Sequence, residues 1–290
     1  MTILIKAFRF LLVLPLAIAP SLLEAKSYVI GKLIGQLGNQ MFIIAATTSL
    51  ALDNGAIPVF PELTNPPQPD FNIPHNYQKL FAHLNSKKPS LKKKRLYSEP
   101  HFHYSPIPYK KNIKLSGHFT SEKYFLKHKQ KIINLFSPSP QIVSYLKSKY
   151  QDIIDHPNTV SIHLRSYLKE DPDGGYHITY GITYFQKAMS LFPEDTLFIV
   201  FSNDMNKCKR EFANIPGNLR FIEGEDYIDD FFLMSMCKHN IISNSTFSWW
   251  AAYLNRNPEK TVIAPFPWFG PSAKLDTKDL IPEGWHIIHN

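Results

Sequence analysis

The chain has 290 residues, of which 44% are hydrophobic and 19% charged, so it is long enough for one large globular domain or two ordinary ones. Its net charge of +8 suits a phosphate-bearing substrate or an anionic membrane surface, whereas no module typical of nucleic-acid binding is recognisable. Two cysteines, Cys208 and Cys237, are too few for a disulfide framework or a zinc site, and we expect reduced thiols.

The N-terminus has the pattern of a signal peptide. Lys6 and Arg9 precede an apolar stretch over 10–19, which is shorter than the roughly 20 residues of a spanning helix. We therefore expect residues 1–26 to be a cleaved export signal or a weak membrane anchor, and the protein to be membrane-associated on a side that the sequence leaves open. A basic run over 87–95 would add membrane contact, although a solvated loop is the simpler interpretation.

Residues 27–156 predict an N-terminal α/β domain that opens with a β-turn-α-β unit. Proline is dense over 61–110, which predicts loops there. The expected elements, in chain order, are a strand over 28–33, a glycine turn over 35–38, a helix over 39–54, a strand over 57–60 and helices near 76–84, 121–136 and 139–154.

Residues 157–290 predict a C-terminal α/β domain in which strands and helices alternate. The expected strands cover 159–164, 196–202, 219–223, 240–243 and 261–264, and the helices between them cover 182–191, 204–213, 228–238 and 245–255. Short strands that are apolar on both faces predict a parallel, doubly wound sheet. Such sheets bind ligands beyond the carboxyl ends of their strands.

Two of these strand ends carry candidate ligand-binding side chains. The first ends in His163-Leu-Arg165, and an arginine offers a planar fork of donors that suits a diphosphate, although a surface salt bridge is the simpler role. The second leads to Asp204, which either caps the next helix or accepts hydrogen bonds from a ribose or a base; the two roles are compatible.

The fourth strand leads through Ser243-Asn-Ser-Thr246 into a helix. Small hydroxyl and amide side chains at a helix N-terminus are typical of an anion site, and ordinary capping explains them too. Trp249 and Trp250 point apart on that helix, so we expect one in the core and the other facing the cleft. In the first domain, Asn39 and Gln40 either reach across the cleft or cap their helix.

Several motifs occur together and in order. They are Gly35-Gln-Leu-Gly-Asn-Gln-Met-Phe42, Gly117-His-Phe-Thr-Ser-Glu-Lys-Tyr-Phe125, His163-Leu-Arg165, Phe201-Ser-Asn-Asp204, Asn244-Ser-Thr-Phe-Ser-Trp-Trp250 and Val262-Ile-Ala-Pro265. The set resembles glycosyltransferase family 11, the α-1,2-fucosyltransferases.

The resemblance implies the GT-B architecture, with two Rossmann-like doubly wound domains facing a cleft. It also implies a galactoside 2-α-L-fucosyltransferase that moves L-fucose from GDP-fucose to the 2-hydroxyl of a terminal β-galactoside on a glycan or glycolipid, with inversion and no metal or other cofactor. Arg165 would bind the donor diphosphate. The other donor-site residues would be Asn244, Ser245, Thr246, Ser248 and Asp204, with Gly35, Gly38, Asn39 and Gln40 facing the cleft from the first domain.

The chain departs from the family after Arg165. Ser166-Tyr-Leu-Lys-Glu170 replaces a second arginine and Gly-Asp-Tyr, so a carboxylate of the family motif is missing. Glu170, Asp171 and Asp173 are candidate general bases; we favour Asp171, and we count His163, Arg165 and Asp171 as catalytic.

Two alternatives accompany this interpretation. Asp171-Pro-Asp173 matches the Asp-x-Asp metal motif of another glycosyltransferase architecture, but it lies in a glycine-rich loop and not at a strand end, so we expect no metal. The altered motif also fits a non-catalytic or weakly active GT-B relic that binds carbohydrate or nucleotide sugar.

Overall fold

The structure is a computed structural model that describes residues 26–66, 71–91 and 95–289. The expected leader, apart from Lys26, and the middle of the basic run at 87–95 lie outside the described residues. In the ranges that are described, no helix is long and apolar enough to cross a membrane.

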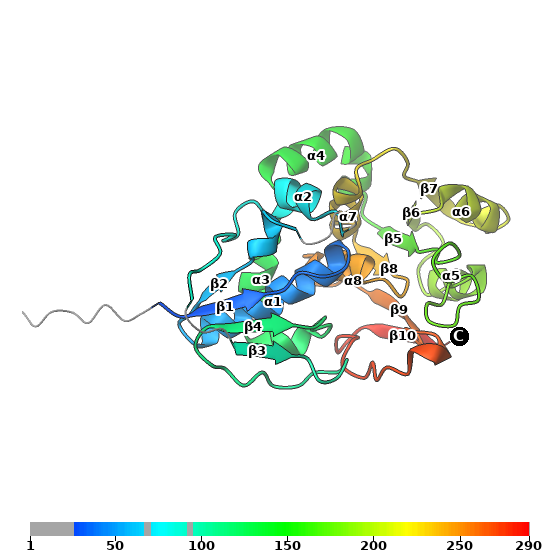
Figure 1. Ribbon diagram of the computed structural model, residues 1–290. Helices are drawn as coiled ribbons and strands as arrows, with labels where there is room; N and C mark the ends of the chain where they lie inside the picture. The colour runs from blue at the N-terminus through cyan, green and yellow to red at the C-terminus, as the bar shows by residue number, and fades with distance from the viewer. Residues whose placement is uncertain (1–25, 67–70, 92–94, 290) are drawn as a thin grey trace, which may run out of the picture.

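The molecule contains two parallel sheets (Figure 1). The first has the order β2-β1-β4-β3, with β1 at Tyr28–Gly31, β2 at Ile57–Val59, β3 at Arg95–Ser98 and β4 at Ile113–Ser116. The second has the order β7-β6-β5-β8-β9-β10, with β5 at Thr159–Leu164, β6 at Leu197–Ser202, β7 at Asn218–Phe221, β8 at His239–Ile241, β9 at Val262–Phe266 and β10 at His286–His289. The predicted pair of doubly wound α/β units is confirmed.

Helices connect and cover the strands. They are α1 at Leu37–Asp53, α2 at Ile73–Asn76 with a π-helical turn at Tyr77–Phe81, α3 at Lys129–Leu135, α4 at Pro140–Asp155, α5 at Ile182–Met189, α6 at Met205–Phe212, α7 at Tyr227–Met236 and α8 at Thr246–Leu254. The helix expected over 121–136 is instead two 3₁₀ turns followed by α3.

Three strands were absent from the sequence prediction. β3 and β10 lie at sheet edges and are largely exposed, so their sequences lack the continuous apolar character of a buried strand. β4 lies inside the first sheet, but its four residues alternate between buried and half-buried positions and follow a proline-rich stretch. By contrast, all six residues of β5 are buried, and this strand was predicted to the residue.

The second sheet has the strand order of a dinucleotide-binding fold. Counted along the chain from β5, the order is 3-2-1-4-5-6, so the direction of winding reverses between β5 and β8. Ligands of open α/β sheets bind at this switch point, beyond the carboxyl ends of the two strands. The topology therefore directs attention to the residues that follow Leu164 and Ile241.

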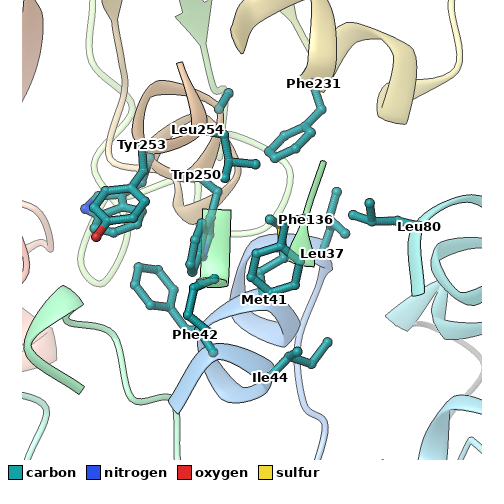
Figure 2. Close-up of a cluster of buried hydrophobic side chains, with 14 of the residues drawn as sticks. Leu37, Met41, Phe42, Ile44, Leu80, Phe136, Phe231, Trp250, Tyr253 and Leu254 are labelled. Atoms are coloured by element: carbon teal, nitrogen blue, oxygen red, sulfur yellow. The ribbon is translucent and has the colours of Figure 1, made fainter. Parts of the chain in front are cut away.

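A continuous hydrophobic core joins the two sheets through α1 and α8. Measured between centroids, the Phe42 ring of α1 lies 5.0 Å from the Trp250 ring (Figure 2). It also lies 4.5 Å from the Trp249 ring. Both tryptophans are 0% exposed, so the expectation that one of them faces the cleft was wrong: both rings belong to the core and contact Phe42.

Helix α4 precedes residue 156 but packs on the second half of the chain. It lies against α7, and its Tyr150 hydroxyl donates to Glu225 at 2.6 Å. Asp152 of α4 also pairs with Arg220 of β7. Helix α4 thus belongs to the first predicted domain by sequence and contacts elements of the second. The domain boundary at residue 156 stays a prediction.

Candidate active site

Two backbone segments are hydrogen-bonded at the switch point. The Arg165 amide donates to the Ser243 hydroxyl at 2.9 Å, and that hydroxyl donates in turn to the His163 carbonyl. Ser243 is fully buried, so the link is shielded from water. The end of β5 is therefore fixed beside the turn that leads into α8, as the sequence prediction required.

The guanidinium of Arg165 lies above the ring of Tyr167, at 4.8 Å from its centroid, and forms an ion pair with Glu170 at 2.7 Å. The Tyr167 hydroxyl donates to the Asn244 carbonyl at 3.0 Å. Stacking of this kind fixes the direction of an arginine. Tyr167 is thus a candidate site residue that the sequence analysis missed. The feature that could have indicated it is its aromatic ring, two positions after Arg165.

The next residue after Arg165 is held by the neighbouring strand. The Ser166 amide donates to the Asn203 side chain at 2.8 Å, and the Asn203 amide returns a bond to the Ser166 carbonyl at 3.0 Å. Asn203 belongs to the Phe201–Asp204 motif, so this motif fixes the Arg165 loop. Asp204 itself caps α6 by accepting from the Lys207 amide at 3.1 Å, which confirms capping; a contact with the donor stays a prediction.

His163 is 6% exposed, and its ring lies 5.5 Å from the Phe247 ring. Burial, with a smaller contribution from the Arg165 charge, lowers the pKa of His163 to about 3. The imidazole is therefore neutral at pH 7. Its Nδ1 atom is buried without a hydrogen-bond partner in the described structure.

The start of α8 keeps its amides open to an anion. Its N-cap residue, Ser245, makes no side-chain capping bond, and the first N–H groups of an uncapped helix together with its dipole attract negative charge. The Ser248 hydroxyl points back along the helix, where it donates to the Ser245 carbonyl. The Asn244 amide anchors two loops by donating to the Ile178 and Trp268 carbonyls, each at 2.9 Å.

The turn before α1 depends on glycine and on Gln40. Gly35 has φ +70°, and a Cβ there would collide with Asn39. Gln40 is 0% exposed; its amide donates to the Gly35 carbonyl at 2.7 Å and its oxygen accepts from Asn76 at 2.8 Å. The buried side chain of Gln40 therefore stabilises the conformation of this turn through its hydrogen bonds.

The two helix starts touch across the domains. A Cβ on Gly38 would lie 2.4 Å from the carbonyl carbon of Thr246 and 2.6 Å from its hydroxyl. The N-termini of α1 and α8 thus meet, and both helix dipoles present their positive ends there. Positive helix ends attract an anionic ligand.

Asp171 anchors its own loop. One of its oxygens accepts from the amides of Tyr176 at 2.7 Å and His177 at 2.6 Å, and these bonds hold the pKa of Asp171 below its usual range. Its role as a general base stays a prediction. No group of three or more His, Cys, Asp or Glu side chains suited to a metal ion occurs within 26–66, 71–91 or 95–289.

Comparison with known proteins shows the family of this chain. The sequence pattern of "Glycosyl transferase family 11" matches residues 7–289. The chain belongs to glycosyl transferase family 11. Among curated relatives, an α-1,2-colitosyltransferase of Escherichia coli is 32% identical over 204 residues, which cover 68% of this chain and 69% of that protein.

Other members of the family are also similar. The O-antigen biosynthesis glycosyltransferase WbnK of Escherichia coli is 32% identical, over 55% of this chain and 56% of the relative. Human galactoside α-(1,2)-fucosyltransferase 1 is 28% identical, over 76% of this chain and 63% of the relative. In these two comparisons the match spans less than two thirds of the relative's length.

Solved structures support the fold. The fucosyltransferase NodZ from Bradyrhizobium superposes with a TM-score of 0.50 at 11% identity, covering 78% of this chain and 92% of NodZ. At that identity the likeness concerns the architecture alone, and it agrees with the two parallel sheets described above. The chain is a GT-B member of glycosyl transferase family 11.

Proposed function

We propose that this protein is an inverting galactoside 2-α-L-fucosyltransferase that moves L-fucose from GDP-fucose to the 2-hydroxyl of a terminal β-galactoside. Family membership and the relatives named for α-1,2 transfer support the reaction class. The observation that carries the proposal is the position of Arg165, hydrogen-bonded through its backbone to the turn that starts α8. In this proposal the Arg165 guanidinium and the N-termini of α1 and α8 contact the same diphosphate.

Such a site favours departure of GDP. As the acceptor oxygen bonds to the anomeric carbon, the bond from that carbon to the β-phosphate oxygen breaks and the diphosphate gains negative charge. Arg165 and the first amides of α8 stabilise that charge more in the transition state than in the ground state. At pH 7 His163 is a neutral imidazole, so it adds no positive charge to that of Arg165.

A carboxylate must accept the proton of the acceptor hydroxyl. Asp171 remains our proposed base through the oxygen that does not hold the Tyr176 and His177 amides. Glu170 is the alternative, since it already lies 2.7 Å from the Arg165 guanidinium. We further propose that transfer needs no metal ion, that residues 1–26 associate the protein with a membrane, and that the acceptor is a galactose-terminated glycan.

The donor sugar has a second candidate. The α-1,2-colitosyltransferase relative is 32% identical to this chain, a higher value than the 28% of the human fucosyltransferase. A nucleotide-activated colitose is therefore tested beside GDP-fucose.

The experiment compares donor binding with transfer. At 100 times its dissociation constant, GDP-fucose should add about 2.7 kcal/mol to the free energy of unfolding, and transfer to lactose should persist in EDTA. Arg165→Ala should abolish transfer in a folded protein. Arg220→Ala is the matched control, since Arg220 pairs with Asp152 at the surface.

Each result has a defined meaning. Near-normal transfer by the Arg165 variant would refute the mechanism. Donor binding by the parent protein without transfer to any β-galactoside would favour the relic alternative. Absence of any nucleotide-sugar effect on unfolding would reject the proposed function itself.

A further inference from the structure

A second hollow lies between the two halves of the molecule. It has a volume of about 450 Å³ and is lined by residues 99–103, His118 and residues 274–276. The first segment follows β3 and His118 follows β4, so one wall comes from the carboxyl edge of the first sheet. Residues 274–276 follow β9 and form a wall from the carboxyl edge of the second sheet.

Strand order relates this pocket to the donor site. In the first sheet, β4 lies beside β1, whose following turn carries Gly35. In the second sheet, β9 lies beside β8, whose following turn carries Ser245. Each wall therefore lies next to the element of its own sheet that builds the proposed donor site.

A row of rings connects the pocket with the Arg165 guanidinium. Phe102, in the pocket wall, lies 5.2 Å from Phe269, and Phe269 lies 6.1 Å from His177. His177 stacks on Tyr167 at 4.4 Å, and Tyr167 carries Arg165 above its face. This row crosses from the first half of the chain to the second, with an edge-to-face step between Phe102 and Phe269, and so forms a partly apolar connection between the two sites.

The pocket lining suits a sugar. His101 and His103 stack at 4.9 Å with an angle of 7° between their rings, and the carboxylates of Glu99 and Asp276 lie in the same lining. Flat rings contact the C–H face of a pyranose, while imidazole and carboxylate edges exchange hydrogen bonds with its hydroxyls. A concave site with a few fixed polar groups is the usual form of a small-ligand site.

The walls are held in place. Glu99 accepts from the amides of His118 at 2.7 Å and Phe119 at 2.9 Å, and a Cβ on Gly117 would lie 2.4 Å from the Glu99 Cβ. His103 lies 3.3 Å from Asp276 and so joins the two walls. The pocket is thus formed before any ligand binds, which lowers the entropic cost of binding.

We propose that this pocket binds the glycan acceptor and holds the sugar unit next to the galactose that receives the fucose. The inference rests on the proposed function, because it assumes that the galactose 2-hydroxyl meets the donor beside Arg165. It adds the residues that recognise the acceptor, with His101 as an exposed ring contact and Leu275 as part of the opposite wall.

Two variants test the pocket in opposite ways. His101→Ala removes a ring from the lining, and Leu275→Trp fills the space with a larger side chain. Titration calorimetry with N-acetyllactosamine, in the presence and absence of GDP, should show affinity weakened about tenfold in the first variant and lost in the second. GDP affinity should stay within about twofold.

His286→Ala is the matched control, because His286 is an exposed histidine at the amino end of β10, away from the carboxyl edge of the sheet. In steady-state assays His101→Ala should raise KM for the acceptor and leave kcat and the donor KM nearly unchanged.

Unchanged disaccharide affinity in both pocket variants would overturn the inference, and so would a parent protein that binds GDP but not the disaccharide. Failure of GDP and GDP-fucose to bind the parent would instead refute the proposed function. In that event, titration with N-acetyllactosamine in the absence of GDP would still test whether the pocket binds the disaccharide.

Discussion

The start of α1 touches the start of α8 at Gly38 and Thr246, where a Cβ on the glycine would lie 2.4 Å from the threonine carbonyl carbon. This contact brings together two helix N-termini that come from different sheets. It leaves no room for a side chain, so the close approach of the two helices depends on the absence of a Cβ atom at residue 38.

Gly38→Ser should therefore destabilise the protein by about 1–3 kcal/mol and weaken GDP binding, because α1 and α8 must move apart. Thermal unfolding and GDP titration measure the two effects. Gly181→Ser is the control: nothing lies within 4 Å of a Cβ at Gly181, and serine is favoured at this N-cap of α5. Equal stability of the two variants would contradict the packing described here.

The general base is distinguished by two isosteric substitutions. Asp171→Asn should lower kcat by about 100-fold or more if Asp171 takes the acceptor proton, with GDP affinity retained. Glu170→Gln removes the partner of Arg165 and frees its guanidinium, so GDP should bind several-fold more tightly, by roughly 1 kcal/mol, while kcat persists.

The reverse pattern would identify Glu170 as the base. Asp171→Asn would then show reduced stability of the loop, since its contacts with Tyr176 and His177 would weaken, and Glu170→Gln would lose turnover. Initial rates at saturating donor and acceptor, measured beside GDP titrations, separate the two assignments.

The C-terminal half was predicted well because buried central strands and amphipathic helices leave strong periodic signals. All of β5 is buried, and its predicted bounds are those of the structure. The edge strands β3 and β10 left no such signal, because one or both faces of an edge strand meet solvent. The placement of Arg165 beside Ser243 followed from topology: neighbouring parallel strands end at the same edge.

Other contacts depend on packing between residues far apart in sequence. The burial of both Trp249 and Trp250 involves contact of each ring with Phe42 of α1, and no local pattern in the sequence contains that fact. The same holds for Tyr167, which gains its role only when Arg165 stacks on it. Gln40 was expected to reach across the cleft or to cap its helix; its polar atoms bind the surrounding backbone and Asn76, and a contact with the donor stays a prediction.

The Gln40 contacts predict a stability effect that spans the two halves. Gln40 joins the Gly35 carbonyl to Asn76, and Asn76 accepts from the Tyr227 hydroxyl at the start of α7. Gln40→Leu should cost about 2–4 kcal/mol, since it leaves several buried polar groups without partners. Tyr227→Phe removes one bond and should cost about 1 kcal/mol.

Urea unfolding of the single and double variants checks this network. Because both substitutions act on Asn76, the double variant should lose less stability than the sum of the single ones. Strict additivity would show that Gln40 and Tyr227 act independently.

The pKa of His163 predicts how stability depends on pH. Its folded value of about 3 lies below the ordinary value, so between these values the unfolded chain binds a proton that the folded chain does not. The contribution of His163 to the free energy of unfolding is fully present above pH 6.5. It declines as the pH falls, by about 2 kcal/mol between pH 7 and pH 5. His163→Gln should remove that part of the decline, whereas the exposed control His286→Ala should retain it. Chemical unfolding at pH 7 and pH 5 measures the difference, and parallel curves for the parent and His163→Gln would show that the imidazole gains a proton without cost in the folded state.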